Sequence, residues 1–144
     1  MALLSKYLFI QPSTIPGAGQ GLFTNVFIPK GTRIIEYTGK VTNWEDADHQ
    51  DGMNVYIYYV SDDHVIDAAK RKKSLARYAN DARGMKKIKG LTNNSEYVEE
   101  GNKVYIEATK DIPAGHEILV SYGKEYWDVL KKNYADLKRE SGAV

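Results

Sequence analysis

The sequence predicts a single domain over residues 1–144, mainly β with short helices, an α+β fold. Three observations predict it. Short apolar or β-branched segments recur along the chain, bounded by glycine, proline or aspartate. A Pro-x-Gly phrase occurs twice, each time before such a segment. An amphipathic stretch ends the pattern, and the whole length suits one domain.

Seven segments have the composition of strands. They are 7–10, 21–24, 33–37, 55–60, 65–66, 104–107 and 118–120. Asn43 is a good helix cap, which predicts a short helix over 44–49. Apolar residues at three- and four-residue spacing predict a C-terminal amphipathic helix over about 124–139.

The repeated phrase predicts two tight turns. Ile28-Pro29-Lys30-Gly31 is echoed by Ile112-Pro113-Ala114-Gly115. Proline fixes φ and glycine tolerates positive φ, so both copies are expected to turn the chain into a strand.

Composition excludes several classes of protein. The chain has no cysteine, which removes disulfides, cysteine–zinc sites and thiol catalysis. Its three histidines lack metal-ligand spacing, so no metal site is predicted. The Met1–Leu4 stretch is too short for a signal peptide, and no apolar run has membrane-spanning length. We expect a soluble intracellular protein, in the cytoplasm or nucleus or in a bacterial cytoplasm.

The segment 70–89 is strongly basic, with nine lysines and arginines against Asp81 alone. It is either a solvated loop or a surface for an acidic partner or nucleic acid. The total charge of +1 and the lack of aromatic residues other than Tyr78 argue against nucleic acid.

Three segments are candidates for chemistry. Alternate glycines in Gly17–Phe23 allow close backbone approach to a ligand, or simply a mobile loop. Asn80 has a donor and an acceptor that could hold a ligand, although Asn-Asp before glycine is also a common bend. The last strand runs into Tyr122, with Tyr126 and Trp127 close behind, an arrangement suited to gripping a cationic substrate.

The order of these segments resembles the SET-domain family of protein-lysine methyltransferases, which use S-adenosylmethionine and release S-adenosylhomocysteine. The resemblance runs from about 13 to 127. Gly17–Phe23 is similar to the family's Gly-x-Gly segment, and Glu117–Gly123 to its closing Glu-Leu-x-x-x-Tyr-Gly motif. Between them, Arg77–Asn80 resembles Arg-Phe-Ile-Asn, and 93–95 occupies the place of Pro-Asn-Cys.

The resemblance implies small curved sheets and a C-terminal segment threaded beneath a preceding loop, a pseudoknot. It implies that Tyr122 is the catalytic residue; the alternative is a phenol satisfied by a backbone carbonyl. The implied donor-binding residues are Gly19, Gln20, Gly21, Arg77, Tyr78, Asn80 and Asp81. The implied substrate-binding residues are Tyr126, Val120, Tyr37, Tyr56 and Trp127.

Two of these residues have further implications. Trp127 could equally be core packing. Val120 stands where the family often has an aromatic residue that limits the number of methyl groups, so valine implies di- or trimethylation.

The chain departs from the family in two respects. Asp81 stands where the family usually has histidine, and the cysteine-rich flanking modules are absent. Asp81 supports the alternative of a SET-like binding module without turnover that recognises a protein tail or an acidic partner. The expected partner of an active enzyme is a protein with an accessible lysine. Histones are a familiar target class of the family, and either a monomer or a dimer would fit.

Overall fold

The computed structural model describes residues 3–49, 54–82 and 90–122. Within them the chain is mainly β, as predicted, and no helix is long and apolar enough to cross a membrane. The predicted C-terminal helix over 124–139, with Tyr126 and Trp127, lies outside the described residues.

The strands are β1 (Leu8–Pro12), β2 (Gln20–Thr24), β3 (Arg33–Glu36), β4 (Lys40–Thr42), β5 (Ile57–Ser61), β6 (His64–Asp67), β7 (Ser95–Glu100), β8 (Lys103–Ala108) and β9 (Val120–Ser121). The short 3₁₀ helices are η1 (Ser5–Tyr7) and η3 (Leu75–Tyr78).

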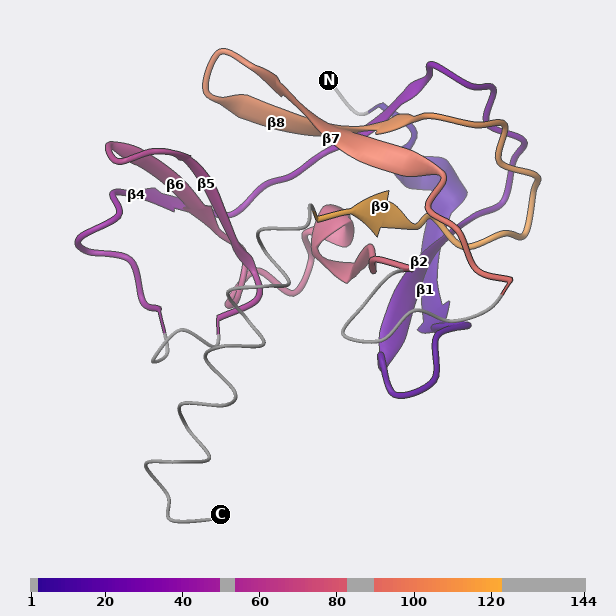
Figure 1. Cartoon of the computed structure of the whole chain (residues 1–144), viewed down its shortest axis with the longest axis horizontal. Coiled ribbons are helices and arrows are strands. Elements are labelled where there is room, and N and C mark those ends of the chain that lie inside the picture. Colours follow the sequence, from indigo (N-terminus) through magenta and orange to yellow (C-terminus); the bar gives the residue numbers. More distant parts are fainter. Residues whose placement is uncertain (1–2, 50–53, 83–89, 123–144) are drawn as a thin grey trace.

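The described strands form three small sheets, as the SET resemblance implies (Figure 1). One is the β1–β2 hairpin, one has the order β3-β8-β7-β9, and one has the order β4-β6-β5. All pairs are antiparallel except β7 with β9, which is parallel. A parallel pair requires a long connection between its strands. Here about twenty residues separate the end of β7 from the start of β9.

Strands β4 and β7 were not predicted from the sequence, and one predicted helix is wrong. Three of the six residues of β7 are glutamates, which disfavour a strand, although full pairing with β8 overrides that preference. Asn43 does cap a turn, because its Oδ1 accepts the Asp46 N–H at 2.7 Å. The turn does not continue as a helix, since the His49 ring bonds the Trp44 carbonyl that the next turn would use.

The two Pro-x-Gly turns are confirmed, and they also pair with each other. Gly31 and Gly115 have φ of 89° and 85°, a region that glycine enters without strain. Ile28 and Ile112, just before the two turns, form an antiparallel bridge with both N–H···O distances at 2.8 Å. The repeated phrase therefore places two distant parts of the chain side by side.

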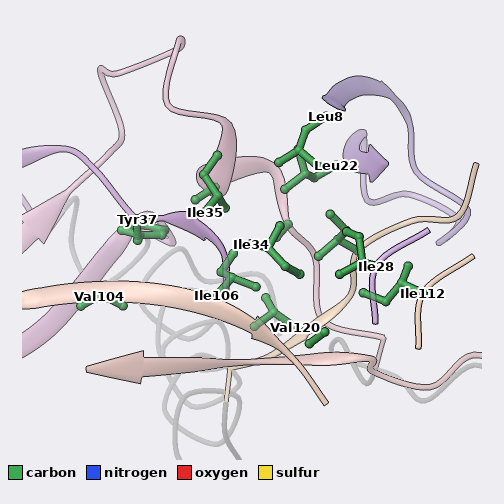
Figure 2. Close-up of a cluster of buried hydrophobic side chains, with 14 of the residues drawn as sticks. Leu8, Leu22, Ile28, Ile34, Ile35, Tyr37, Val104, Ile106, Ile112 and Val120 are labelled. Atoms are coloured by element: carbon green, nitrogen blue, oxygen red, sulfur yellow. The ribbon is translucent and has the colours of Figure 1, made fainter. Parts of the chain in front are cut away.

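Branched aliphatic side chains fill the centre of the molecule (Figure 2). Residues from β2, β3, β8 and β9 meet there with the isoleucines of the two turns. The fully buried members include Leu22, Ile28, Ile34, Ile106, Ile112, Ile118, Val104 and Val120. Burial of these side chains supplies the main driving force for folding.

The segment Glu117–Ser121 joins three parts of the fold. Its backbone donates from Ile118 to the Leu22 carbonyl at 2.7 Å, and from Val120 to the Asn80 carbonyl at 2.9 Å. On its other side, the Leu119 N–H donates to Asn94 Oδ1 at 2.9 Å. Both ends of the connection between Asn80 and Asn94 are therefore bonded to this segment. Residues 83–89 of that connection lie outside the described residues, so the threading itself stays a prediction.

Glu117 is a buried anchor for the β1–β2 loop. Its carboxylate accepts hydrogen bonds from Ser13 Oγ at 2.7 Å, from Thr14 N at 2.9 Å and from Thr14 Oγ1 at 2.5 Å. A Cβ placed on Gly21 would lie 2.3 Å from Glu117 Oε2, so a larger residue would displace the carboxylate from its present position. The glycine-rich segment is therefore fixed at its base, not free as a loop.

We expect Glu117→Gln to lower the free energy of unfolding by about 1–3 kcal/mol, because charge-assisted hydrogen bonds are lost and an NH₂ group faces donors. Urea denaturation measures the change. Glu96→Gln, at an exposed position on β7, is the matched control and should be neutral. Equal stability of the Glu117 variant and the wild type would contradict the anchoring role.

We expect Ile106→Ala to cost about 2–5 kcal/mol of unfolding free energy, because the side chain is fully buried and its removal leaves a cavity. Thermal and urea denaturation measure this loss. Val41→Ala, at a position that is 59% exposed, should change the stability by far less. Similar losses in the two variants would mean that the core is not where the structure places it.

Candidate active site

Tyr122 is fixed at both ends to the segment that carries Asn80. Its N–H donates to Asp81 Oδ2 at 2.9 Å, and its hydroxyl donates to the Ala79 carbonyl at 2.5 Å. The phenol therefore does bond a backbone carbonyl, which the sequence analysis gave as the alternative to a catalytic role. The same side chain also lines a pocket, so the hydrogen bond holds it at a cavity wall.

A pocket of about 60 Å³, here called the tyrosine pocket, lies beside Tyr122. Its rings contact one another in sequence: Tyr122 stacks on Tyr97 at 6.1 Å, Tyr97 meets Tyr58 at 5.2 Å, and Tyr58 meets Tyr37 at 6.1 Å between ring centroids. The described lining residues are Tyr37, Val55, Ile57, Tyr58, Tyr97 and Tyr122. A chain of mutually packed rings makes a rigid aromatic wall.

Hydrogen bonds fix two phenols of this wall. Tyr37 donates to the Tyr56 carbonyl at 2.6 Å, and Tyr58 donates to Glu99 Oε2 at 2.9 Å. Burial raises the pKa of Tyr58 well above its ordinary value, and the hydrogen bond to Glu99 and its negative charge raise it further. The wall therefore presents ring faces, which attract a cation, in surroundings that disfavour charge.

Asn80 connects the tyrosine pocket to the glycine-rich segment. Its Nδ2 donates to the Gln20 carbonyl at 2.9 Å, and the preceding residue is Ala79, which accepts the Tyr122 hydroxyl. Gly19 is held through its own carbonyl by the Ser13 N–H at 2.8 Å, while the space where its Cβ would stand is open. The space beside the Gly19 Cα is therefore open, and the carbonyl of the next residue, Gln20, is held by Asn80.

Asp81, the departure from the family pattern, holds Tyr122 in place. It is only 4% exposed, and its second oxygen accepts Asn93 Nδ2 at 2.9 Å. Asn93 in turn accepts the Ala82 N–H at 2.7 Å. A carboxylate can accept two hydrogen bonds on separate oxygens, whereas a neutral histidine has a single acceptor nitrogen. The aspartate is therefore well suited to joining Asn93 to the Tyr122 backbone.

Other expected site residues lie elsewhere. The Arg77 guanidinium packs on the rings of Tyr56 at 4.1 Å and Tyr78 at 5.1 Å, and it donates to the Ala68 carbonyl at 2.8 Å. The Tyr56 ring therefore faces this arginine and is not among the lining residues of the tyrosine pocket. Val120 is fully buried in the core and is not among the described lining residues of the pocket. The di- or trimethylation that a valine here implies stays a prediction.

Several residues of the site were missed by the sequence analysis. Tyr58 and Tyr97 complete the tyrosine pocket, and the Ala79 carbonyl and Asn93 position Tyr122. The eleven tyrosines were a signal for the rings, but Tyr97 lies on the unpredicted strand β7. A backbone carbonyl leaves no signal in composition at all.

Comparisons with known proteins agree with this geometry. The SET domain family matches residues 19–123. The chain is 26% identical over 153 aligned positions to the histone-lysine N-methyltransferase EZH2 of Chaetomium thermophilum, covering 96% of this chain and 10% of that protein. The chain thus spans about a tenth of the length of that relative. Its fold is similar to the methyltransferase domain of human PR domain-containing protein 2, with a TM-score of 0.61, 25% identity, and coverage of 84% of this chain and 82% of that domain. The chain with the tyrosine pocket and the Asn80 junction belongs to the SET domain family.

Proposed function

We propose that this protein transfers a methyl group from S-adenosylmethionine to the side-chain amine of a lysine in a protein substrate. The observation that carries the proposal is the 2.5 Å hydrogen bond between the Tyr122 hydroxyl and the Ala79 carbonyl. That bond links Tyr122, which lines the tyrosine pocket, to Ala79. The next residue, Asn80, donates to the Gln20 carbonyl in the glycine-rich segment. Two adjoining sites are what a transfer between two bound reactants requires.

The donor would lie against the glycine-rich turn and the Asn80 segment, where open space meets backbone polar groups. When bound, S-adenosylmethionine supplies a methyl group on a positively charged sulfur, so the chemistry needs no covalent enzyme intermediate. Arg77 and Tyr78 contribute indirectly, because they fix the turn that precedes Asn80. The residues proposed to bind the donor or to shape its site are Gly19, Gln20, Gly21, Arg77, Tyr78, Asn80 and Asp81.

The tyrosine pocket would receive the lysine side chain. A free lysine has a pKa of about 10.4, so neutralising it near pH 7 costs roughly 4–5 kcal/mol. Burial between neutral rings lowers that pKa, and the positive charge of the donor acts in the same direction. The described lining residues include no carboxylate or imidazole, so the proton would leave to solvent before transfer.

Tyr122 would orient the amine at the junction of the two sites. Its hydroxyl proton is committed to the Ala79 carbonyl, so toward the reacting groups the phenol oxygen would act as a hydrogen-bond acceptor. The Ala79 oxygen beside it has a second lone pair as well. Fixed acceptors of this kind attract a methyl group that carries partial positive charge. Orientation of the two reactants can lower the activation barrier by about 7–11 kcal/mol.

The substrate is proposed to be a protein, with histones as the first class to test because one relative is named a histone-lysine methyltransferase. Tyr126 and Trp127 stay predicted walls of the lysine channel, and Tyr37 is the expected substrate residue that lines the tyrosine pocket. Asp81 raised the alternative of an inactive binding module. Asp81 accepts hydrogen bonds from the Tyr122 N–H and from Asn93, and so it positions Tyr122. This role favours an active enzyme over an inactive binding module.

We expect Tyr122→Phe to lower the rate of methyl transfer by about 10²-fold or more, because the orienting oxygen is lost. Donor affinity should change little, since the ring and its stacking on Tyr97 are kept. Single-turnover assays with labelled donor and calorimetry measure the two quantities. Tyr59→Phe, at an exposed tyrosine outside the tyrosine pocket, is the matched control. A Tyr122→Phe enzyme with nearly wild-type turnover would remove Tyr122 from the mechanism.

We expect Asn80→Ala to weaken the binding of S-adenosylmethionine by about ten-fold or more, because the amide that holds the Gln20 carbonyl is lost. Calorimetric titration measures the Kd without any need for the protein substrate. Asn102→Ala, in the exposed turn between β7 and β8, is the control and should bind the donor normally. Unchanged donor affinity in Asn80→Ala would place the donor elsewhere.

A further inference from the structure

Four consecutive basic residues, Lys70–Lys73, form an exposed turn, here called the basic turn. Among the described residues, the ion pairs within 4.0 Å both involve Arg33, so no carboxylate there neutralises these four cations. A run of exposed charge is usually just a solvated surface. Two further features distinguish this one.

The first feature is that the backbone of the basic turn is fixed from below. Tyr78 donates its hydroxyl to the Lys72 carbonyl at 2.8 Å, and Ser74 donates to the Thr38 carbonyl at 2.8 Å. Arg77 Nη1 holds the preceding carbonyls of Ala68 and Ala69, at 2.8 Å and 2.9 Å. A turn held in this way loses little conformational entropy when it binds a partner.

The second feature is a groove whose lining begins at the residue that follows Tyr37 in the chain. It is lined by Thr38, Gly39, the basic turn and Ser74, and its volume is about 570 Å³, against about 60 Å³ for the tyrosine pocket. Tyr37 lines the pocket, and the next two residues line the groove. A protein segment with its lysine in the pocket would therefore present neighbouring residues to the cations.

We propose that the basic turn recognises acidic side chains near the target lysine of a protein substrate. This inference rests on the proposed function. Adjacent residues, Tyr37 and Thr38, line the pocket proposed for the lysine and the groove, so an anion that reaches the groove together with the lysine would be carried on the same polypeptide. The Tyr78 hydroxyl is bonded to the turn itself, and the described residues of the groove lining include no aromatic ring on which a nucleic-acid base could stack. Carboxylates are the matching chemistry.

The acidic residues are expected close to the target lysine in sequence. Consecutive Cα atoms are about 3.8 Å apart, and adjacent residues line the pocket and the groove, so anions within about five positions of the lysine could reach the turn. Lysine-rich flanks would be repelled there.

The test uses the full chain and paired peptides, each with a central lysine flanked by either glutamate or glutamine. The wild type should methylate the glutamate peptide with a kcat/KM about three- to ten-fold higher, mainly through KM, and the preference should fade as salt is added. The double variant Lys72→Gln/Lys73→Gln should lose the preference but keep its activity on the glutamine peptide. Lys30→Gln/Lys110→Gln, which removes two exposed charges elsewhere, should keep it.

Other outcomes would overturn the proposal. Equal kcat/KM for the two peptides in the wild type would do so, as would a preference that survives in the basic-turn variant. A fluorescent DNA duplex that binds through Lys72 and Lys73, with no peptide preference, would show nucleic acid to be the partner. If no peptide is methylated, the proposed function fails, and fluorescence anisotropy of the labelled peptides then decides the inference: turn-dependent binding of the glutamate peptide supports it, and its absence refutes it.

Discussion

The site depends on the position of one short segment, Glu117–Tyr122, between two asparagine-bearing parts of the chain. Its backbone bonds Asn80 on one side and Asn94 on the other, and its first residue anchors the β1–β2 loop through a buried carboxylate. The phenol at its end then reaches the Ala79 carbonyl. Because each of these bonds fixes a different element, the pocket and the glycine-rich turn are positioned by the same few residues.

Much of the fold could be predicted from local chemistry. The two Pro-x-Gly turns and most of the strands follow from residue type alone, because proline, glycine and β-branched residues act over a few positions. Strand β7 could not be predicted, since its glutamates are tolerated only because β8 pairs with it along its whole length. The helix expected after Asn43 does not form because a side chain within the same segment, the His49 ring, bonds the Trp44 carbonyl.

The candidate site divides in the same way. The sequence pointed to Tyr122 and Asn80, and the structure brings their segments together. Tyr56 could not be separated from Tyr58 by sequence, because residues two apart in a predicted strand are expected on the same face. Tyr56 lies just before β5 and packs on Arg77, whereas Tyr58 lies within β5 and lines the tyrosine pocket. The role of Asp81 is equally invisible in sequence, since it depends on Asn93 lying beside it.

The parallel pairing of β7 with β9 has a consequence for biosynthesis. During translation, Asn94, Ser95 and the Leu22 carbonyl emerge long before the residues that satisfy them, Ile118 and Leu119. The nascent chain must hold these groups in water, with the core open on that side, until its closing segment leaves the ribosome. Contacts of such long sequence separation form late and slowly. A chain stalled just before residue 117 would expose apolar surface and unpaired strand edges, and chaperones would be expected to recognise it.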